Sequence, residues 1–465
     1  MIILGTNSIK DTGFDVANSC RFDGSSSSLN LAPSSGGSLK KATYSFWLKK
    51  CINGTAMEIF SHVAVNNNTD FRILFAANDK LYIINQDNTS DTVQLFTNRL
   101  FRDPSAWYHI VIAIDTTDAT AGDRVKVYVN GIRETSFSTQ NNPSQDEELK
   151  INGGTNTMNF IGQRYTGSSS IFFNGYMAEV VYVNGTANAV TDFGEFDEDS
   201  GIWKPIDVSG LTFGTNGFYL DFEDSANLGN DASGGTDFTE NGLAAIDQST
   251  DTCTNNGNTF QPLDLQASTQ TLAEGNLKVT TDSGGDWDTV ASTIGVTSGK
   301  WYFEAKLITL GSNAIIGVID INDARLNTTS SYYIGQSTPG CGYQNNGARP
   351  DTGASFGNSY TNNDIIGVAI DMDNLKVYFS KNGTFQNSGD PTSGATGTGA
   401  QDLTANTTYC FAVSGYSSTV WEANFGSPAF AISSGNTDGD GYGNFEYAVP
   451  SGYYSLNTKN LAEYG

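Results

Sequence analysis

The stretch VKVYVNG at residues 125–131 decides the fold class of this chain, and it recurs almost unchanged as KVYFSKNG at residues 376–383. In the first copy three valines alternate with Lys126 and Tyr128, so one face of an extended strand is apolar. Each copy runs into Asn-Gly, which accepts the positive φ that a type I′ turn needs at both central positions. Each copy therefore predicts a β-hairpin.

Each hairpin sequence follows an apolar run that ends in Asp, namely HIVIAID at 109–115 and IIGVAID at 365–371. In the second copy Leu375, Val377 and Phe379 are predicted to share the apolar face. A meander of antiparallel strands with one apolar face must bury that face against a second sheet. The two copies predict an all-β protein with two antiparallel β-sandwiches.

Bulk composition agrees with this fold class. A chain of 465 residues exceeds one ordinary core, and 51 glycines supply many turns. The 24 Lys and Arg against 50 Asp and Glu give a formal charge of −26, which argues against nucleic-acid binding. Because the sequence has no run of 18 apolar residues, no membrane span is predicted. The start, MIILGTNSIKDTGF, lacks the basic region and apolar core of a signal peptide, so export by that route is not expected.

Cysteine and histidine are scarce and scattered. The five cysteines form no CxxC pair, and buried thiols are the favoured interpretation; the state of Cys20 and Cys51, which could lie in adjacent strands, stays open. With only His62 and His109 available, zinc sites and Ser-His-Asp chemistry are poorly supplied.

The first half contains, in this order, the motifs RFDGSSSSLNL (21–31), YSFWLK (44–49), AWYHIVIAID (106–115), VKVYVNG and FNGYMAEVVYVNG (173–185). In the order and spacing of these motifs, roughly 170 residues resemble the laminin-G/pentraxin-like, concanavalin A-type jelly-roll family. The resemblance implies a lectin-like sandwich.

The second half contains the motifs SGKWYFE (298–304), IIGVID (315–320), DIIGVAIDMDNLKVYFSKNG (364–383) and VWEANFGSPAF (420–430). With these motifs it resembles the SPRY domain. The resemblance implies a bent β-sandwich that binds protein partners through loops.

The segment between them differs in composition. DFGEFDEDSGIWKP (192–205) is acidic and rich in turn formers, and NLGNDASGGTDFTENG (227–242) is dominated by Gly, Asn and Asp. We therefore predict a jelly roll with its connector at 1–225, a linker at 226–275, and a SPRY-like sandwich with a C-terminal extension at 276–465.

Catalytic motifs are weak, and no enzyme activity is predicted. Concanavalin A-like glucanases use the pattern ExDxxE on one strand. EFDEDS at 195–200 supplies Glu195 and Asp197, but Ser200 stands at the second Glu position. In FYLDFED, Asp221 and Glu223 are predicted on one strand face without a third carboxylate.

Two sets of residues are candidates for binding. Aromatic rings and an Arg that are expected to lie exposed on SPRY loops are candidates to contact a glycan or a protein: Tyr332, Tyr333, Tyr343 and Arg349. The alternative is that these are ordinary loop residues. Oxygen-bearing side chains at alternate positions of a Gly-rich loop suit calcium: Asn436, Asp438, Asp440 and Asn444. Because Tyr447 replaces the closing Glu of an EF-hand loop, a Gly/Asp turn is the favoured interpretation. No other cofactor is predicted.

The whole arrangement resembles virion structural proteins of tailed phages, especially marine ones, and FEYAVPSGYYSLNTKNLAEYG (445–465) resembles a segment that recurs in them. This implies assembly in the host cytoplasm and display on the virion surface, among other virion proteins. One predicted role is a tail fibre or appendage that binds host-surface glycans or partner proteins. A capsid decoration protein acting through protein contacts is the alternative, and a secreted carbohydrate-active enzyme a distant one. Exposed sheet edges favour a homo-oligomer, trimeric for a fibre.

Overall fold

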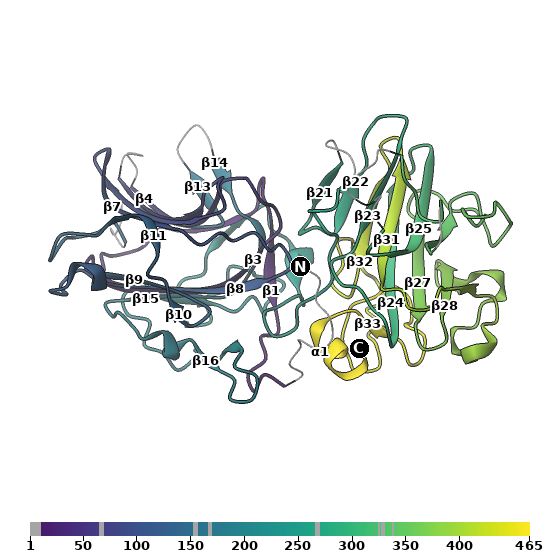
Figure 1. The fold of residues 1–465 in the computed structure, drawn as a ribbon. Helices are drawn as coiled ribbons and strands as arrows, with labels where there is room; N and C mark the ends of the chain where they lie inside the picture. The colour runs from purple at the N-terminus through teal and green to yellow at the C-terminus, as the bar shows by residue number, and fades with distance from the viewer. Residues whose placement is uncertain are drawn as a thin grey trace. The chain divides into compact units, whose positions relative to one another are not determined.

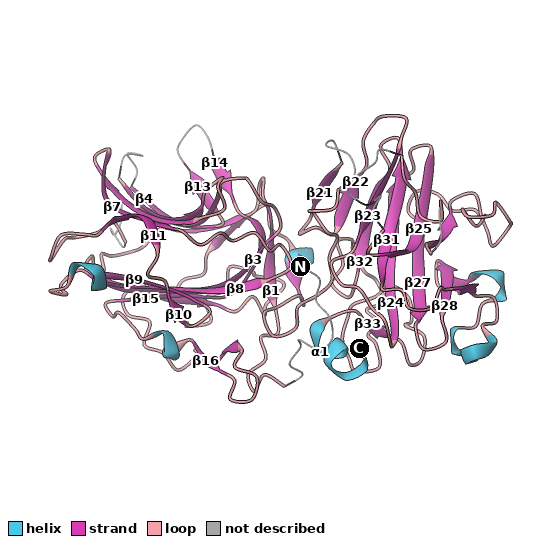
Figure 2. Ribbon diagram, in the orientation of Figure 1, coloured by secondary structure: helices cyan, strands magenta, loops and turns pink. Residues whose placement is uncertain are grey.

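A computed structural model describes residues 11–64, 69–151, 157–165, 170–265, 270–323, 326, 331–336 and 339–465. The chain divides into two compact units, an N-terminal unit (Asp11–Thr254) and a C-terminal unit (Asn255–Gly465). Strands and loops make up nearly all of both units (Figures 1 and 2). The predicted all-β class with stacked antiparallel sheets is confirmed.

The N-terminal unit is built on two large sheets that face each other. The first sheet contains, in spatial order, β10 (Ile132–Arg133), β9 (Val125–Val129), β8 (Trp107–Asp115), β3 (Lys41–Lys50), β15 (Asn174–Asn184), β1 (Ser19–Asp23) and β20 (Gln248–Ser249), with β18 (Phe218–Leu220) paired to β15. The second contains β11 (Phe137–Asn141), β7 (Ser90–Thr97), β6 (Leu81–Asp87), β5 (Asp70–Phe75), β4 (Met57–Ala64), β12 (Thr157–Ile161), β2 (Ser28–Leu31) and β19 (Thr239–Asn241). Two hairpins lie beside them, β13 (Gln163–Tyr165) with β14 (Ser170–Phe172) and β16 (Gly194–Phe196) with β17 (Trp203–Pro205).

The C-terminal unit stacks a large sheet on a smaller one. The large sheet contains β21 (Thr271–Ala273), β22 (Lys278–Thr280), β32 (Val420–Asn424), β24 (Lys300–Thr309), β27 (Ile365–Asp371), β28 (Lys376–Lys381) and β29 (Thr384–Phe385), with β30 (Gln401–Asp402) on β28 and β33 (Tyr454–Ser455) on β24. The small sheet contains β23 (Trp287–Ala291), β31 (Tyr409–Tyr416), β25 (Asn313–Asp320) and β26 (Cys341–Gln344). Helical segments are short: η2 (Ala121–Asp123), η3 (Val190–Asp192), η4 (Ala245–Asp247), η5 (Gln386–Ser388), η6 (Pro391–Thr396) and α1 (Thr458–Tyr464).

Both hairpins that the sequence predicts are present. The turn after β9 has Asn130 at φ 48° and Gly131 at φ 77°, and the turn after β28 has Asn382 at φ 47° and Gly383 at φ 77°. Three valines of β9 enter the core between the two N-terminal sheets. Leu375 differs from the prediction, because it lies in the turn before β28 with φ 56° and is not a strand residue. Val377 and Phe379, the other two residues of the predicted apolar face, lie in β28 and belong to the core.

The segment predicted as a linker, 226–275, is divided between the two units. Residues 226–254 pack in the N-terminal unit, where Leu228 and Phe238 join the core and β19 and β20 extend the two sheets. Residues from 255 onward pack in the C-terminal unit, where Phe260 is a core residue; residues 266–269 lie outside the described residues. Residues 226–254 are not a free linker because burial of the apolar side chains of Leu228 and Phe238 in the core stabilises the folded segment.

The acidic connector covers the outer face of the first sheet of the N-terminal unit. The indole of Trp203 packs against Gly131, where a Cβ atom would lie 2.2 Å from the ring, so this turn needs glycine for both conformation and space. Trp203 donates its indole N–H to Nδ1 of His109 at 2.9 Å, and Nε2 of His109 lies 2.9 Å from the hydroxyl of Ser45. Burial lowers the pKa of His109 to about 3, so this histidine is a neutral structural residue.

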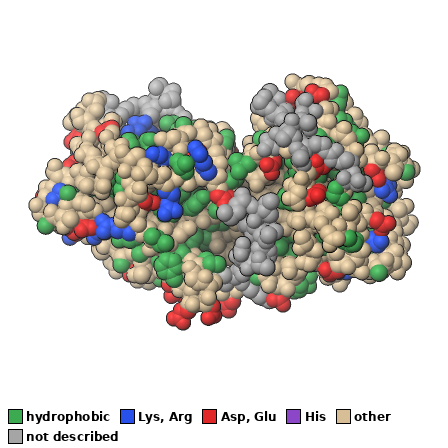
Figure 3. Space-filling model, viewed as in Figure 1, with side chains coloured by type: hydrophobic (Ala, Val, Ile, Leu, Met, Phe, Trp, Pro, Cys, Tyr) green, Lys and Arg blue, Asp and Glu red, His purple; other side chains and the backbone are tan. Residues whose placement is uncertain are grey.

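The five cysteines are free thiols, including Cys20 and Cys51, whose state the sequence left open. Burial raises the pKa of Cys51 to about 12, which keeps it protonated and unreactive. Within the described residues, none of the helices has the length and apolar character that a bilayer crossing requires. On the face drawn in Figure 3, charged side chains are dispersed among polar side chains and backbone.

A buried polar cluster lies on the outer face of the second sheet, where the β13–β14 hairpin contacts β4 (Figure 1). Met57 and Ile59 of β4 point into the core, so Glu58 between them points outward, yet it is fully buried. Arg72 and Arg164 form ion pairs with Asp70 beside it. Burial raises the pKa of Glu58 to about 8, although the two guanidinium groups act in the opposite direction.

Replacing Glu58 by glutamine is expected to change how stability depends on pH. As pH rises from about 5 to 8, the unfolded chain loses the Glu58 proton while the folded chain keeps it, so the wild-type protein loses stability. The Glu58→Gln variant lacks this effect, and its stability relative to wild type should rise by about 1.4 kcal/mol per pH unit across that window. Urea unfolding of both proteins at several pH values measures the difference, and parallel curves would show that Glu58 titrates normally.

Candidate functional site

Two of the four candidate ligand-binding residues are buried, and the expectation that they lie exposed on loops is wrong. Tyr332 is 1% exposed and donates its hydroxyl to Asp323 at 2.9 Å. Tyr343 is 0% exposed in β26, where its ring packs on Tyr360 and its hydroxyl donates to the carbonyl of Asn358. Each ring fills interior space and each hydroxyl has an internal acceptor, so both are packing residues.

The other two candidates are half-buried and have internal partners. Tyr333 packs on Trp287 with ring centroids 5.0 Å apart. Arg349 makes a two-pronged ion pair with Asp351, with N–O distances of 3.1 and 2.7 Å. Tyr333 therefore contacts an aromatic residue of β23, whereas Arg349 is engaged with a carboxylate of its own turn. Ligand binding at these two residues stays a prediction.

The candidate calcium loop is organised around Asp438 as a hydrogen-bond acceptor. One carboxylate oxygen accepts from the backbone N–H groups of Asp440 and Tyr442, at 3.0 and 2.9 Å. The other accepts from the N–H and hydroxyl of Ser455 and from the amide of Asn460, at 2.9, 2.7 and 2.8 Å. Five donors surround this buried carboxylate, and donors repel a cation as they attract an anion. Asp438 thus ties the Gly-rich turn to the C-terminal segment.

The remaining residues of that loop point to different partners. The amide of Asn436 donates to the carbonyls of Phe445 and Glu446, and Asp440 accepts from the hydroxyl of Tyr464. The carbonyl of Asn444 accepts from Asn424. Over the described part of the chain, no three His, Cys, Asp or Glu residues are grouped as a metal site would require. The turn interpretation accounts for all of these contacts.

The carboxylates considered for glycoside hydrolysis lie on the β16–β17 hairpin and just after β18. Glu195 and Asp197 both reach Lys204, at 3.4 and 3.5 Å, on the β16–β17 hairpin. Asp221 and Glu223 follow β18, which ends at Leu220. The predicted alternation on one strand face is wrong, because Phe222 between them has φ 60° and breaks the extended conformation.

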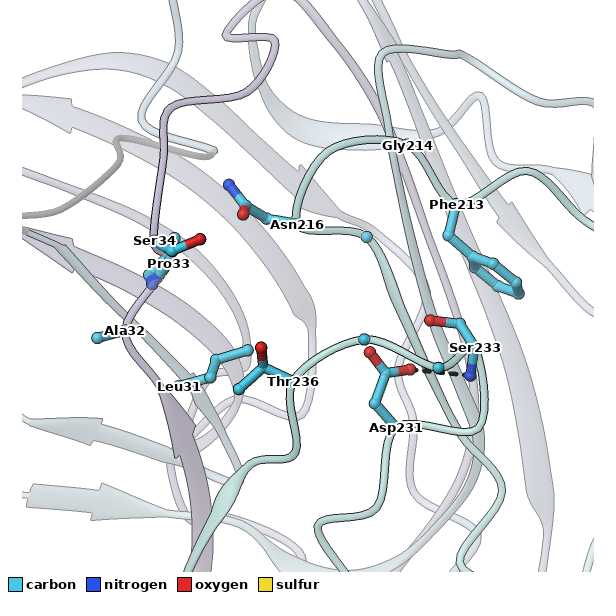
Figure 4. A pocket seen from close by; sticks show the side chains of 13 residues that line it. Leu31, Ala32, Pro33, Ser34, Phe213, Gly214, Asn216, Asp231, Ser233 and Thr236 are labelled. Carbon is cyan, nitrogen blue, oxygen red and sulfur yellow. Dashed lines mark hydrogen bonds between the residues drawn. The ribbon is translucent and has the colours of Figure 1, made fainter.

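A cavity of about 450 Å³ opens at one end of the N-terminal sandwich (Figure 4). It is lined by three segments, residues 31–34 after β2, residues 213–217 before β18, and residues 231–236 between β18 and β19. Pro33, which lacks the N–H that a ladder uses, follows the end of β2, and Asn216 at φ 60° turns the chain before β18. The cavity therefore lies where loops from both sheets meet.

Asp231 is the one ionisable residue among those that line this cavity. Its side chain is 5% exposed, and its Oδ1 accepts from the backbone N–H groups of Tyr219 and Ser233, both at 3.0 Å. Its backbone N–H donates to Asp237 at 3.0 Å, which fixes the turn. Oδ2 accepts no hydrogen bond from any described residue, and the carboxylate points toward the space between the loops that carry Asn216 and Ser233 (Figure 4).

Besides the aliphatic side chains of residues 31–33, the cavity is lined by hydroxyl groups and an aromatic ring. Ser34, Ser233 and Thr236 contribute hydroxyl groups, and the ring of Phe213 stacks on Tyr219 with centroids 6.2 Å apart. The amide of Asn216 donates to the carbonyl of Ser35 at 2.6 Å, which holds the loop over the cavity. A fixed carboxylate oxygen, hydroxyls and an aromatic ring are suited to a ligand that has both hydroxyl groups and an apolar face. Because one carboxylate lines the cavity, it lacks the acid–base pair of a glycosidase.

Sequence reasoning missed this site because both loops lie in the segments interpreted as connector and linker. The signal was present in the turn formers FGTNG (213–217) and DASGG (231–235), which flank the strand FYL. Gly, Asn and Asp clusters next to strands mark tight loops that bring backbone close to a ligand as well as flexible linkers. Composition alone does not distinguish the two.

Comparisons with known proteins agree with the two resemblances. The model of the concanavalin A-like lectin/glucanases superfamily matches residues 23–191, and the model of the SPRY domain matches residues 300–424. No curated protein sequence matches the chain.

Several solved structures are similar to parts of the chain. The SPRY domain of human HERC1 is 18% identical, with 35% of this chain and 96% of that chain covered and a TM-score of 0.27. A heptameric SAP-like pentraxin from Limulus polyphemus is 16% identical, with 38% and 80% covered and a TM-score of 0.29. A candidate carbohydrate binding protein from Bacteroides ovatus is 16% identical, with 49% and 59% covered and a TM-score of 0.33. From the family matches and the sheets described above, the chain carries a concanavalin A-like domain of the lectin/glucanase superfamily followed by a SPRY domain.

Proposed function

We propose that this protein is a non-catalytic binding protein whose concanavalin A-like domain holds a saccharide in the cavity at Asp231. The observation that carries the proposal is the Oδ2 atom of Asp231, an acceptor that receives no hydrogen bond from the described residues and faces a cavity of about 450 Å³. Because this oxygen is accessible from the cavity and acts as an acceptor, a ligand hydroxyl placed there would donate a hydrogen bond to it. The lectin-like fold supports the same conclusion.

In the proposed setting the protein is part of a phage virion surface, as a tail fibre or appendage that binds host-surface glycans. Support comes from the sequence resemblance and from the free thiols, which suit assembly in a reducing cytoplasm.

A capsid decoration role through protein contacts is the second candidate. One observation favours it, the group of half-buried rings formed by Trp287, Tyr333 and Tyr416 on the C-terminal unit. Aromatic side chains of this kind are enriched at protein interfaces.

A glycan array combined with a hydrolysis assay tests the function. The purified full-length chain is expected to retain at least one glycan and to leave its glycosidic bonds intact after long incubation. Retention without turnover supports the proposal. Absence of any binding would reject it in favour of the decoration role, and release of shorter sugars would establish an enzyme.

A further inference from the structure

The cavity at Asp231 has a charge that restricts its ligands. No Lys, Arg or His is among the residues that line it, so the Asp231 carboxylate is not neutralised by a cation in the cavity wall. Its 5% exposure places this charge where the effective dielectric is lower than in water, and a second negative charge nearby would be repelled more strongly than at an open surface.

The two carboxylate oxygen atoms of Asp231 differ in their hydrogen bonds. Oδ1 accepts from the backbone N–H groups of Tyr219 and Ser233, which hold the carboxylate in place. A carboxylate oxygen is a hydrogen-bond acceptor, so the ligand atom opposite Oδ2 must carry a proton. A sugar hydroxyl meets this requirement, and a ligand carboxylate does not.

Gly235 keeps Oδ2 accessible. A Cβ atom at this position would lie 2.1 Å from Oδ2 of Asp231, closer than any non-bonded contact allows. The backbone at Gly235 does not have the left-handed conformation that only glycine tolerates well. An alanine here would therefore act at Oδ2 rather than through backbone strain.

From this arrangement we propose that the cavity selects neutral saccharides by a hydroxyl-to-Asp231 hydrogen bond and rejects acidic saccharides such as uronic and sialic acids. The inference rests on the proposed saccharide-binding function and names its ligand class. Its consequence is that the protein distinguishes neutral from acidic surface polysaccharides.

Matched ligand pairs test the selectivity. Binding of methyl glucoside, galactoside and mannoside is measured by titration calorimetry beside the corresponding methyl uronides, which differ only by a carboxylate at C6. For each pair that binds, the neutral member is expected to bind at least about tenfold tighter, and the ratio should shrink as salt rises from about 20 to 500 mM. Wild-type protein that binds a uronide as tightly as its neutral partner would overturn the selectivity while leaving saccharide binding intact.

Two variants locate the effect. In Asp231→Asn the amide oxygen can keep both backbone hydrogen bonds, while a donor replaces the acceptor at Oδ2; we expect the neutral-to-acidic ratio to fall below about threefold. Gly235→Ala should weaken neutral sugars at least about tenfold. Gly210→Ala is the matched control, because a Cβ there meets no atom within 4 Å.

The outcomes separate the two levels of the proposal. If a sugar binds and both variants at Asp231 and Gly235 leave its affinity unchanged, the inferred site is wrong although the protein binds saccharides. If neither the six methyl glycosides nor any array glycan binds, the proposed function itself fails. Hydrogen exchange of β18, whose Tyr219 N–H donates to Asp231, verifies in each variant that the strand beside the loop at 231–236 still folds.

Discussion

Replacing Asp251 by asparagine is expected to lower the free energy of unfolding of the N-terminal unit by about 3–5 kcal/mol. Its carboxylate accepts from Nζ of Lys49 at 2.8 Å and from the indole N–H of Trp107 at 3.1 Å. The side chains of Lys49 and Asp251 are 1% and 3% exposed. The neutral variant would leave the ammonium of Lys49 buried without its counter-charge, which costs far more than the pair contributes.

Hydrogen exchange measures this change within the intact chain. Peptides that cover β3 and β8 report on the N-terminal unit, and a peptide that covers β27 reports on the C-terminal unit as an internal reference. Asp146→Asn is the matched control, because its 3.3 Å pair with Lys40 is exposed (61% for Asp146) and should cost less than about 1 kcal/mol. If Asp251→Asn and Asp146→Asn lower the free energy of unfolding by the same amount, Asp251 is not an integral part of the N-terminal unit.

Replacing Trp203 by alanine is expected to cost the N-terminal unit about 3–5 kcal/mol. The indole is 7% exposed, lies against Gly131 and Gly194, and donates to Nδ1 of His109. The substitution removes a large buried ring and leaves a buried acceptor of His109 without its donor. The outer face of the first sheet would then be open to solvent.

The neighbouring residue supplies the control for Trp203. Ile202 is 43% exposed on the same hairpin, and Ile202→Ala should change the free energy of unfolding by less than about 0.5 kcal/mol. The same exchange peptides from β3 and β8 give both values. Equal effects of the two substitutions would mean that the connector does not stabilise the sheet beneath it.

Sequence patterns predicted the elements that are determined by residues adjacent in sequence, namely tight turns and strands. Asn130-Gly131 and Asn382-Gly383 adopt the positive φ angles expected, because few other dipeptides tolerate that turn. In β3, Tyr44 and Phe46 enter the core, and Trp47 is covered from the other side. Period-two alternation therefore identified the strands well.

Burial of single residues and the limits of the units depend on distant partners, and here the sequence was a poor guide. Tyr343 belongs to a core strand because Phe356 and Tyr360 enclose it, and both lie on a later loop. Phe238 and Asp251 have partners far away in sequence, so a Gly-rich segment that resembles a linker is part of the sandwich. Asp231 was missed for the same reason, since its role depends on the loop at 213–217 and on the end of β2.

A crystal structure of the chain with a neutral saccharide chosen from the glycan array tests the central claim most directly. The account predicts the sugar in the cavity at Asp231, with a hydroxyl oxygen within hydrogen-bond distance of Oδ2 and the glycosidic bond intact. A sugar held elsewhere on the chain with this cavity empty, or a cleaved sugar beside paired carboxylates, would contradict it.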